Sequence, residues 1–175
     1  MSSLHTTLNQ LSQADAERAL RACCASSAWV TKMLEHRPFA TSDRVLAAAD
    51  EIWTKLGRSD TLEAFAGHPK IGESLATLRE RFAKTAHWSS QEQAGVTLAK
   101  DELLEELRQL NVAYEQRFGY IFIVCATGKS AEEMLDLLKA RLHHSPEQEL
   151  GVAADEQAKI TRIRLEKLAN TEVTP

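Results

Sequence analysis

The stretch Gly67-His68-Pro69-Lys70-Ile71-Gly72-Glu73 interrupts a chain that is otherwise patterned as amphipathic helices. Proline has a fixed φ and no N–H, so Pro69 is disfavoured inside a helix and pushes His68 toward an extended conformation. Gly67 is expected to end the helical run before it, and Gly72 provides a second loose joint before the next run. The stretch therefore predicts a helix–loop–helix junction with a histidine at its mouth.

The imidazole of His68 has two interpretations. A histidine whose backbone is stiffened on one side by Pro69 suits proton transfer near neutral pH. The alternative is a turn that contains a histidine with no chemical role. Local spacing leaves both interpretations open.

Helical periodicity continues on both sides of this junction, and a capping residue precedes most of the apolar runs. The expected helix starts are Ser12, Ser26 or Ser27, Ser42, Ser90, Ser130 and Ser145. The helix that starts at Ser42 is expected to end at Gly57. Residues 120–125 are the only strand-like stretch, and without a partner strand they are expected to form a buried extended segment or a helical turn. The pattern predicts one all-α domain over residues 1–175, a compact bundle of about seven to nine helices.

Composition narrows the class of protein. The chain has 175 residues and a net charge of −4, so it lacks the basic character of a nucleic-acid binder. Its longest apolar run is too short to span a bilayer, and its first residues do not resemble a signal peptide. Three cysteines, Cys23, Cys24 and Cys125, do not form a disulfide framework and suggest a reducing compartment. The expectation is a cytoplasmic protein whose cysteines serve packing.

Common catalytic and metal-binding signatures are missing from the sequence. It contains no Gly-rich phosphate loop, no His-Glu-x-x-His, no Gly-x-Ser-x-Gly and no Cys-x-x-Cys. The adjacent His143 and His144 would point about 100° apart on a helix, so they are poor co-ligands and are interpreted as histidines of a C-terminal turn. The other isolated histidines, His5, His36 and His87, are interpreted as surface histidines or as histidines with satisfied hydrogen bonds. No metal site is predicted.

Residues 89–93, Ser-Ser-Gln-Glu-Gln, again have two interpretations. Ser89-x-x-Glu92 and Ser90-x-x-Gln93 both match a capping box, and one of them can start the longest helical run. Alternatively, Ser89, Glu92 and Gln93 line one side of a helix N-terminus and grip a polar ligand such as a ureide or an amide. The spacing is compatible with either.

Two arginines in the last helical run differ in their neighbours. Arg162 has Glu166 four residues later, so it is expected to be exposed and paired along the helix. Arg164 has Ile160 and Leu168 at the same offsets, which places it on the apolar side without a local counter-ion. An unpaired buried charge is costly, so Arg164 should reach solvent, pair with a distant acid, or bind an anionic ligand with its planar guanidinium. The distant acids with this potential are Glu73 and Glu92.

Five motifs, which together span nearly the whole chain, resemble those of one family. They are Arg37-Pro38-Phe39, the stretch Gly67-His68-Pro69-Lys70-Ile71-Gly72-Glu73, Ser89-x-x-Glu92-Gln93-x-Gly95, Asn111-x-x-Tyr114-x-x-x-Phe118-Gly119-Tyr120-x-Phe122-Ile123, and Lys159-Ile160-x-x-Ile163-Arg164-Leu165. In this order they are similar to the motifs of the 2-oxo-4-hydroxy-4-carboxy-5-ureidoimidazoline (OHCU) decarboxylases of urate breakdown. The resemblance implies an all-helical carboxy-lyase that converts OHCU to S-allantoin without a metal or an organic cofactor.

The resemblance also implies roles for particular residues. It implies that His68 is the catalytic histidine and that Glu92 and Arg164 are its catalytic partners. The residues that it implies for substrate binding are Pro69, Ser89, Gln93 and the backbone near Phe122 and Ile123. The expected partner is the small-molecule substrate, with no nucleic acid and no membrane, and a homodimer is left open.

The chemistry of OHCU agrees with the residues found by patterning. Its carboxylate lies on a carbon next to a C=N group, so the imine can receive the electron pair when CO₂ leaves, and no external electron sink is needed. A histidine suits the later proton transfer, and an arginine binds oxygen anions bidentately. Two other classes remain open from the residues alone. They are a helical module that only binds its ligand and a metal-dependent hydrolase with scattered histidines.

Overall fold

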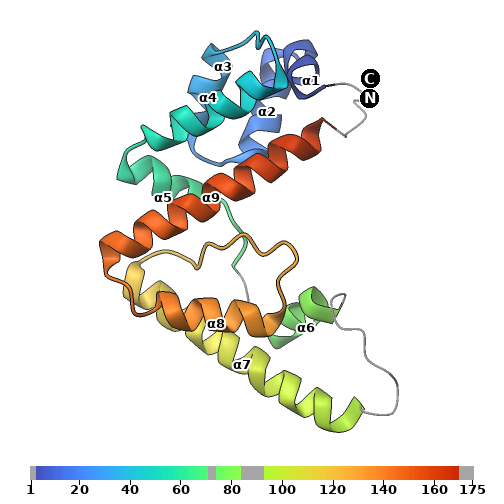
Figure 1. The fold of residues 1–175 in the computed structure, drawn as a ribbon, viewed down its shortest axis with the longest axis vertical. Coiled ribbons are helices and arrows are strands. Elements are labelled where there is room, and N and C mark those ends of the chain that lie inside the picture. Colours follow the sequence, from blue (N-terminus) through green and yellow to red (C-terminus); the bar gives the residue numbers. More distant parts are fainter. Residues whose placement is uncertain (1–2, 71–73, 84–92, 170–175) are drawn as a thin grey trace. The chain divides into compact units, whose positions relative to one another are not determined.

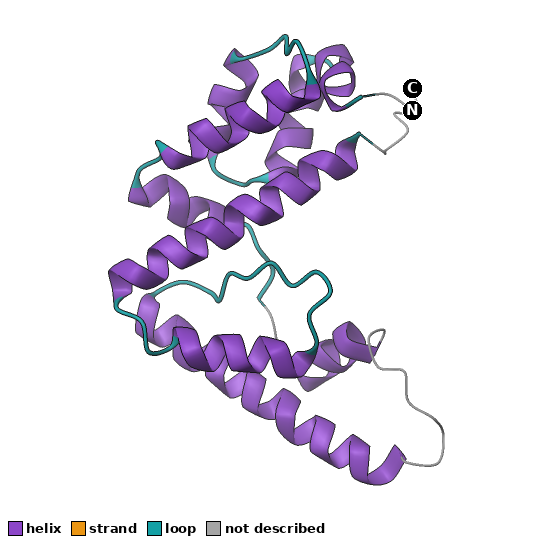
Figure 2. Cartoon of the chain, viewed as in Figure 1, coloured by secondary structure: helices purple, strands orange, loops and turns teal. Residues whose placement is uncertain are grey.

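A computed structural model describes residues 3–70, 74–83 and 93–169 of the chain. These residues form helices joined by loops and contain no strand, as the all-α prediction requires (Figures 1 and 2). The helices are α1 Leu4–Gln10, α2 Gln13–Cys23, α3 Ser27–Glu35, α4 Ser42–Thr54, α5 Arg58–Ala66, α6 Leu75–Ala83, α7 Gln93–Phe118, α8 Ala131–Arg141 and α9 Pro146–Leu168. In the described ranges, no helix combines the length and the apolar character needed to cross a bilayer.

The chain divides into two compact units. The first unit is Met1–His68 together with Ala154–Pro175, and the second is Pro69–Ala153. Helix α9 therefore contributes residues to both units. The expectation of a single domain over residues 1–175 stays a prediction, and each unit is described by itself below.

In the first unit, α3 lies at the centre of the packing. It contacts α2, α4 and α5, and α1 packs on α4. The Trp29 side chain of α3 is fully buried, and its indole N–H donates to the Ala49 carbonyl oxygen at 3.1 Å, so burial leaves no polar group unpaired. Other large apolar side chains with almost no exposure complete this core: Leu8, Leu20, Val30, Met33, Val45 and Phe65.

The capping residues explain where most helices begin. Ser12, Ser26 and Ser130 cap α2, α3 and α8 through their side chains, as predicted. The prediction that Ser42 caps α4 is wrong, because Thr41 accepts the hydrogen bond from the Arg44 backbone N–H at 3.2 Å. The N–H groups in the first turn of a helix have no partner within the helix, and the Thr41 hydroxyl, one residue before Ser42, accepts a hydrogen bond from one of them.

The expected end of the Ser42 helix at Gly57 is also wrong. Helix α4 ends at Thr54, and Gly57 is instead the N-cap of α5. The Asp60 carboxylate accepts a hydrogen bond from the Gly57 backbone N–H at 3.3 Å. A glycine is common at both ends of helices, so its position alone does not tell an end from a start.

The motif Arg37-Pro38-Phe39 has a structural role in the first unit. The Asn9 side chain pairs with the Phe39 backbone in both directions, each hydrogen bond being 2.9 Å. The Arg37 guanidinium donates to the Leu11 carbonyl oxygen at 2.6 Å. These bonds fasten the end of α1, a helix that the sequence patterning did not predict, to the turn before α4.

The second unit is built around α7, which packs on α6 and α8 (Figure 1). Tyr114 on α7 is fully buried and meets the Phe122 ring edge-on, with 5.1 Å between centroids. Residues 121–126 form neither helix nor strand, and Phe122, Ile123 and Val124 within them are buried. The helical-turn interpretation of this segment is therefore wrong, and a buried irregular segment is what remains.

Candidate active site

Gly67 forms the junction that positions His68. Helix α5 ends at Ala66, and the Gly67 and His68 N–H groups donate to carbonyl oxygens of its last turn, each at 3.2 Å. Gly67 has a φ of −75°, which any residue can adopt. Its lack of a side chain matters for a different reason. A Cβ at Gly67 would lie 2.2 Å from the Cβ of Ala25, so only glycine fits this close approach.

We expect Gly67→Ala to lower both stability and the order around His68. The added methyl group must push away the segment of Ala25, and overpacking of this kind costs about 1–3 kcal/mol. The matched control is Gly151→Ala in α9, where a Cβ meets nothing within 4 Å. That control should be neutral or stabilising by about 0.5–1 kcal/mol. Urea denaturation measures the change in the free energy of unfolding in both variants.

A compensating change tests whether the steric clash is the cause. Ala25→Gly removes the methyl group that Gly67→Ala meets, so the double variant should recover much of the lost stability. Equal stability of Gly67→Ala and the unchanged chain would contradict the close approach.

His68 lies between two side chains of α9. Its Nε2 is 2.5 Å from the Oε1 atom of Gln157, and its Nδ1 is 3.5 Å from the Nη2 atom of Arg164. The imidazole is half-buried. The structure thus brings together His68 and Arg164, two of the three residues expected to be catalytic.

Arg164 finds its partners at the end of α2. Its Nη1 atom lies 3.3 Å from the Ala22 carbonyl oxygen and 3.4 Å from that of Cys23. These carbonyls belong to the last turn of α2, where the helix dipole favours a positive charge. The C-terminus of α2 thus partly compensates the positive charge of Arg164, which has no acidic partner on its own helix. Glu73 and Glu92, the acids that the sequence suggested, lie outside the described residues.

Arg162 behaves as the sequence predicted. It is exposed, and its guanidinium lies 3.4 Å from Glu166 along the helix and 3.4 Å from Asp50. Two residues further on, Arg164 faces His68 instead. The prediction that Arg162 is exposed and paired along the helix is confirmed, and the proposed role of the half-buried Arg164 stays a prediction.

His68 is held in its neutral form. Burial lowers the pKa of His68 below its usual 6.5, and the positive charge of Arg164 lowers it further, while the hydrogen bond to Gln157 acts in the opposite direction. An imidazole with a lowered pKa is uncharged at neutral pH. It can accept a proton there, and it becomes charged only as the pH falls below its usual titration range.

Two buried thiols lie close to this site. Burial raises the pKa of Cys23 to about 12 and that of Cys24 to about 11, although the Arg164 charge acts against both shifts. Both groups are therefore protonated thiols at neutral pH and poor nucleophiles. All three cysteines are free, and the described residues contain no group of three or more His, Cys, Asp or Glu side chains arranged to hold a metal ion.

The remaining predicted site residues fall in the second unit or outside the described ranges. Pro69, Phe122 and Ile123 belong to the second unit. Gln93 is the first residue of α7. Glu92 and Ser89 lie outside the described residues, so their roles, like that of Gln93, stay predictions.

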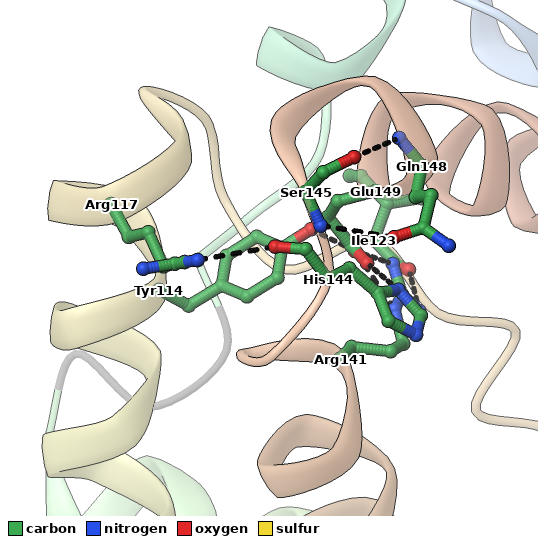
Figure 3. A network of polar contacts seen from close by, with 8 residues as sticks. All are labelled: Tyr114, Arg117, Ile123, Arg141, His144, Ser145, Gln148 and Glu149. Carbon is green, nitrogen blue, oxygen red and sulfur yellow. Dashed lines mark hydrogen bonds and ion pairs between the residues drawn. The ribbon is translucent and has the colours of Figure 1, made fainter.

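A buried ionic network in the second unit was not predicted from the sequence. Figure 3 shows its centre, the Glu149 carboxylate, which is fully buried. The Arg141 guanidinium donates to the Oε1 atom of Glu149 through Nε at 2.8 Å and through Nη2 at 2.5 Å. The Tyr114 hydroxyl donates to the same oxygen, and the His144 ring lies 2.8 Å from the second one. The carboxylate is thus satisfied on both oxygens, as burial requires.

The same network holds the segment that contains Phe122 and Ile123. Arg141 donates to the Ile123 carbonyl oxygen at 2.8 Å (Figure 3). Its guanidinium also lies 4.5 Å from the centre of the Phe122 ring. A sequence signal for Arg141 did exist. It follows Met134 by seven residues and Leu138 by three, on the apolar side of α8, which is the same signal that marked Arg164.

The fold and the site define a class of protein. The described residues form helices and loops, and they place a neutral histidine beside an arginine, two side chains that can act together in proton transfer on an anionic small molecule. The OHCU decarboxylase family profile matches residues 9–166 of the chain. The chain therefore belongs to the OHCU decarboxylase family.

Known relatives support this membership. The chain is 36% identical over 149 residues to the uric acid degradation bifunctional protein TTL of Arabidopsis thaliana, covering 85% of this chain and 45% of that protein. It is 34% identical over 140 residues to the 2-oxo-4-hydroxy-4-carboxy-5-ureidoimidazoline decarboxylase of Amia calva, covering 79% of this chain and 78% of that one. The chain thus spans less than half of the bifunctional relative but most of the Amia calva relative.

Solved structures have the same fold. One is a crystal structure of an OHCU decarboxylase in the presence of (S)-allantoin, with 36% sequence identity and a TM-score of 0.69. The match covers 86% of this chain and 96% of that chain. A crystal structure of an (S)-allantoin synthase, 23% identical and with a TM-score of 0.66, covers 94% of this chain and is itself covered to 53%. The second likeness concerns the fold alone.

Proposed function

We propose that this chain decarboxylates OHCU and releases (S)-allantoin, as a carbon–carbon lyase of urate degradation. The observation that carries the proposal is the contact between the neutral His68 and Arg164 in a chain of the OHCU decarboxylase family. Both the family and the relatives' names point to this substrate.

The reaction needs an anion-binding group and a proton acceptor. The bond between the ring carbon and the carboxylate breaks, and its electron pair forms a double bond to the neighbouring carbon that carries the ureido group. The imine electron pair moves onto the ring nitrogen, which takes up a proton. The resulting enol then loses its hydroxyl proton while a proton adds to one face of the ureido-bearing carbon. One CO₂ is released and one proton is consumed overall.

His68 and Arg164 fit two of these tasks. A neutral imidazole can accept the hydroxyl proton as the enol becomes a ketone, and it can return a proton afterwards. The Arg164 guanidinium can bind the carboxylate or the ring oxygen with two parallel N–H groups. Both side chains are within 3.5 Å of each other, so an oxygen held by one lies close to the other.

The other predicted residues are proposed substrate contacts. We propose that Glu92 accepts hydrogen bonds from the ureido or ring N–H groups of the substrate. In the same proposal Pro69, Ser89, Gln93 and the backbone near Phe122 and Ile123 bind the remaining edges. The buried Arg141 holds the Ile123 carbonyl oxygen, which supports a defined backbone in that segment.

We expect Glu92→Gln to lower turnover about 10- to 150-fold, because a hydrogen bond to a charged group contributes about 1.5–3 kcal/mol. Its thermal stability should change little. The matched control is Glu133→Gln, since Glu133 completes the capping box of α8 by accepting from the Ser130 N–H at 2.7 Å. That control should melt at a lower temperature and keep its turnover. A Glu92→Gln variant that melts early yet turns over normally would show that Glu92 only caps a helix.

One experiment tests the proposed function. OHCU is generated freshly from urate, the purified chain is added, and circular dichroism follows the appearance of optically active allantoin. A lyase forms the S enantiomer faster than the spontaneous reaction does. A binding module would leave the spontaneous rate and the racemic product unchanged. Treatment with a chelator is a separate test. Full activity afterwards would exclude a metal-dependent hydrolase. Independence from cofactors is a prediction.

A cytoplasmic location and a homodimer are predictions too. Gel filtration tests whether the chain forms a homodimer.

A further inference from the structure

Gln157 is the least exposed polar residue of the His68 site. Its side chain is fully buried in α9 and contacts His68 at 2.5 Å and Thr161 at 3.0 Å. Gln157, Thr161 and Arg164 follow one another at spacings of four and three, so they share one face of the helix. A buried amide is stable only if its donors and acceptors find partners. The partners it has here are the functional histidine and a threonine.

The guanidinium of Arg164 indicates which nitrogen of His68 carries the proton. Arginine has only donors, so the His68 Nδ1 atom that faces it must present its lone pair. A neutral imidazole then carries its proton on Nε2. That N–H points at Gln157, whose side chain must therefore offer its carbonyl oxygen rather than its amino group.

The other end of the Gln157 amide agrees with this orientation. Its Nε2 atom donates to the Thr161 hydroxyl oxygen at 3.0 Å. With the amino group of Gln157 directed to the Thr161 oxygen, the amide oxygen is left for His68.

We propose that Gln157 is a positioning residue that holds His68 as the Nε2–H tautomer with the Nδ1 lone pair directed toward Arg164. The inference rests on the proposed function. In that reaction, an oxygen of the substrate bound by Arg164 would lie next to the one imidazole atom able to accept its proton. Because the amide of Gln157 is neutral, its hydrogen bond should favour the imidazolium form less than that of a carboxylate would.

The charged and titratable groups near His68 are few among the described residues. Arg164 acts on the titration of His68 directly, and its charge also acts on the thiols Cys23 and Cys24 at the end of α2. Both thiols stay protonated at neutral pH, because burial raises the pKa of each. A carboxylate placed at position 157 would thus be the nearest negative charge to His68 in this set.

The tautomer can be observed without substrate. Long-range ¹H–¹⁵N spectra of the full chain with ¹⁵N-labelled histidine separate the two neutral tautomers, and the spectrum of His68→Asn assigns the His68 signals by their loss. We expect Nε2–H at pH 7.5 in the unchanged chain and a mixture of tautomers in Gln157→Leu. A predominant Nδ1–H form, or a mixture already in the unchanged chain, would overturn the proposal. Since this result does not depend on turnover, it separates the proposal from the proposed function.

Kinetics distinguish a positioning role from a structural one. Gln157→Leu should lower kcat about 10- to 100-fold, with little change in KM. Losses of this size follow the removal of the hydrogen-bond partner that orients a metal-ligating histidine, and Gln157 orients His68 in the same way. Gln157→Glu should keep the tautomer but raise the pKa of His68, so the acid limb of kcat/KM moves to higher pH and activity recovers above it. The matched control is Arg162→Gln, which changes the net charge equally at an exposed position of the same helix and should leave tautomer and pH profile unaltered. An unshifted profile in Gln157→Glu would overturn the proposal, even if both Gln157 variants were less stable.

Discussion

Replacing His68 by asparagine should lower turnover about 10²- to 10⁴-fold, the usual contribution of a general acid–base group. Asparagine keeps the size and polarity of the side chain but cannot accept a proton at neutral pH. The junction should still form, because it depends on the close approach of Gly67 to Ala25 rather than on the half-buried imidazole. Stopped-flow turnover of fresh OHCU measures the loss.

The pH profile gives a second readout of the same prediction. Burial and Arg164 lower the pKa of His68, so the unchanged chain should keep its activity from pH 8 down to about 6.5, the usual histidine value, and lose it only at lower pH. This acid limb should vanish in His68→Asn. The control is His143→Asn, a change at an exposed histidine of the second unit. Near-normal turnover in His68→Asn would refute the assignment.

Replacing Arg164 by alanine should nearly abolish activity. Arg164 is half-buried in the free chain, and the proposed substrate would complete the burial of its guanidinium. Removing one partner of a charge contact buried in this way costs about 2–5 kcal/mol, which corresponds to a loss of about 30-fold to several thousand-fold. The loss should appear mainly in substrate binding, because the guanidinium is the proposed anchor of the substrate oxygens. Arg164→Lys keeps the charge but not the fork of donors, so it should recover only part of the binding.

Arg162 provides an internal control for Arg164. It lies two residues away on the same helix, is exposed, and pairs with Glu166 and Asp50. An exposed helical ion pair contributes about 0.3–0.5 kcal/mol, so Arg162→Ala should change neither turnover nor stability by much. The assignment fails if the Arg162 variant is the damaged one and the Arg164 variant is not.

Helix positions could be predicted where the caps are local. Ser130 and Glu133 form a capping box within one turn of chain, so their pattern can be recognised without knowledge of the fold. The end of α4 could not be predicted in this way, because Gly57 suits both the end of one helix and the start of the next. Helix α1 was missed because its attachment depends on bonds from Asn9 to Phe39, thirty residues later.

Charged residues on apolar helix faces were the most informative sequence signal for the site. Arg164 was recognised by that signal and does face His68. Arg141 carried the same signal, but its counter-ion Glu149 belongs to the next helix, where an acid in the first turn is also explained by the helix dipole. A local electrostatic explanation therefore concealed a buried partner.

The sequence by itself determined the all-helical class and the family, and it marked His68 and Arg164 as candidates, because periodicity, caps and motif residues are properties of short segments. Only the tertiary structure decided what these side chains touch. The carbonyls at the end of α2 that receive Arg164 are more than 140 positions away from it, and Gln157 is 89 positions away from His68. Hydrogen bonds across such separations depend on how helices pack, so no local pattern predicts that a neutral amide sets the protonated nitrogen of the histidine.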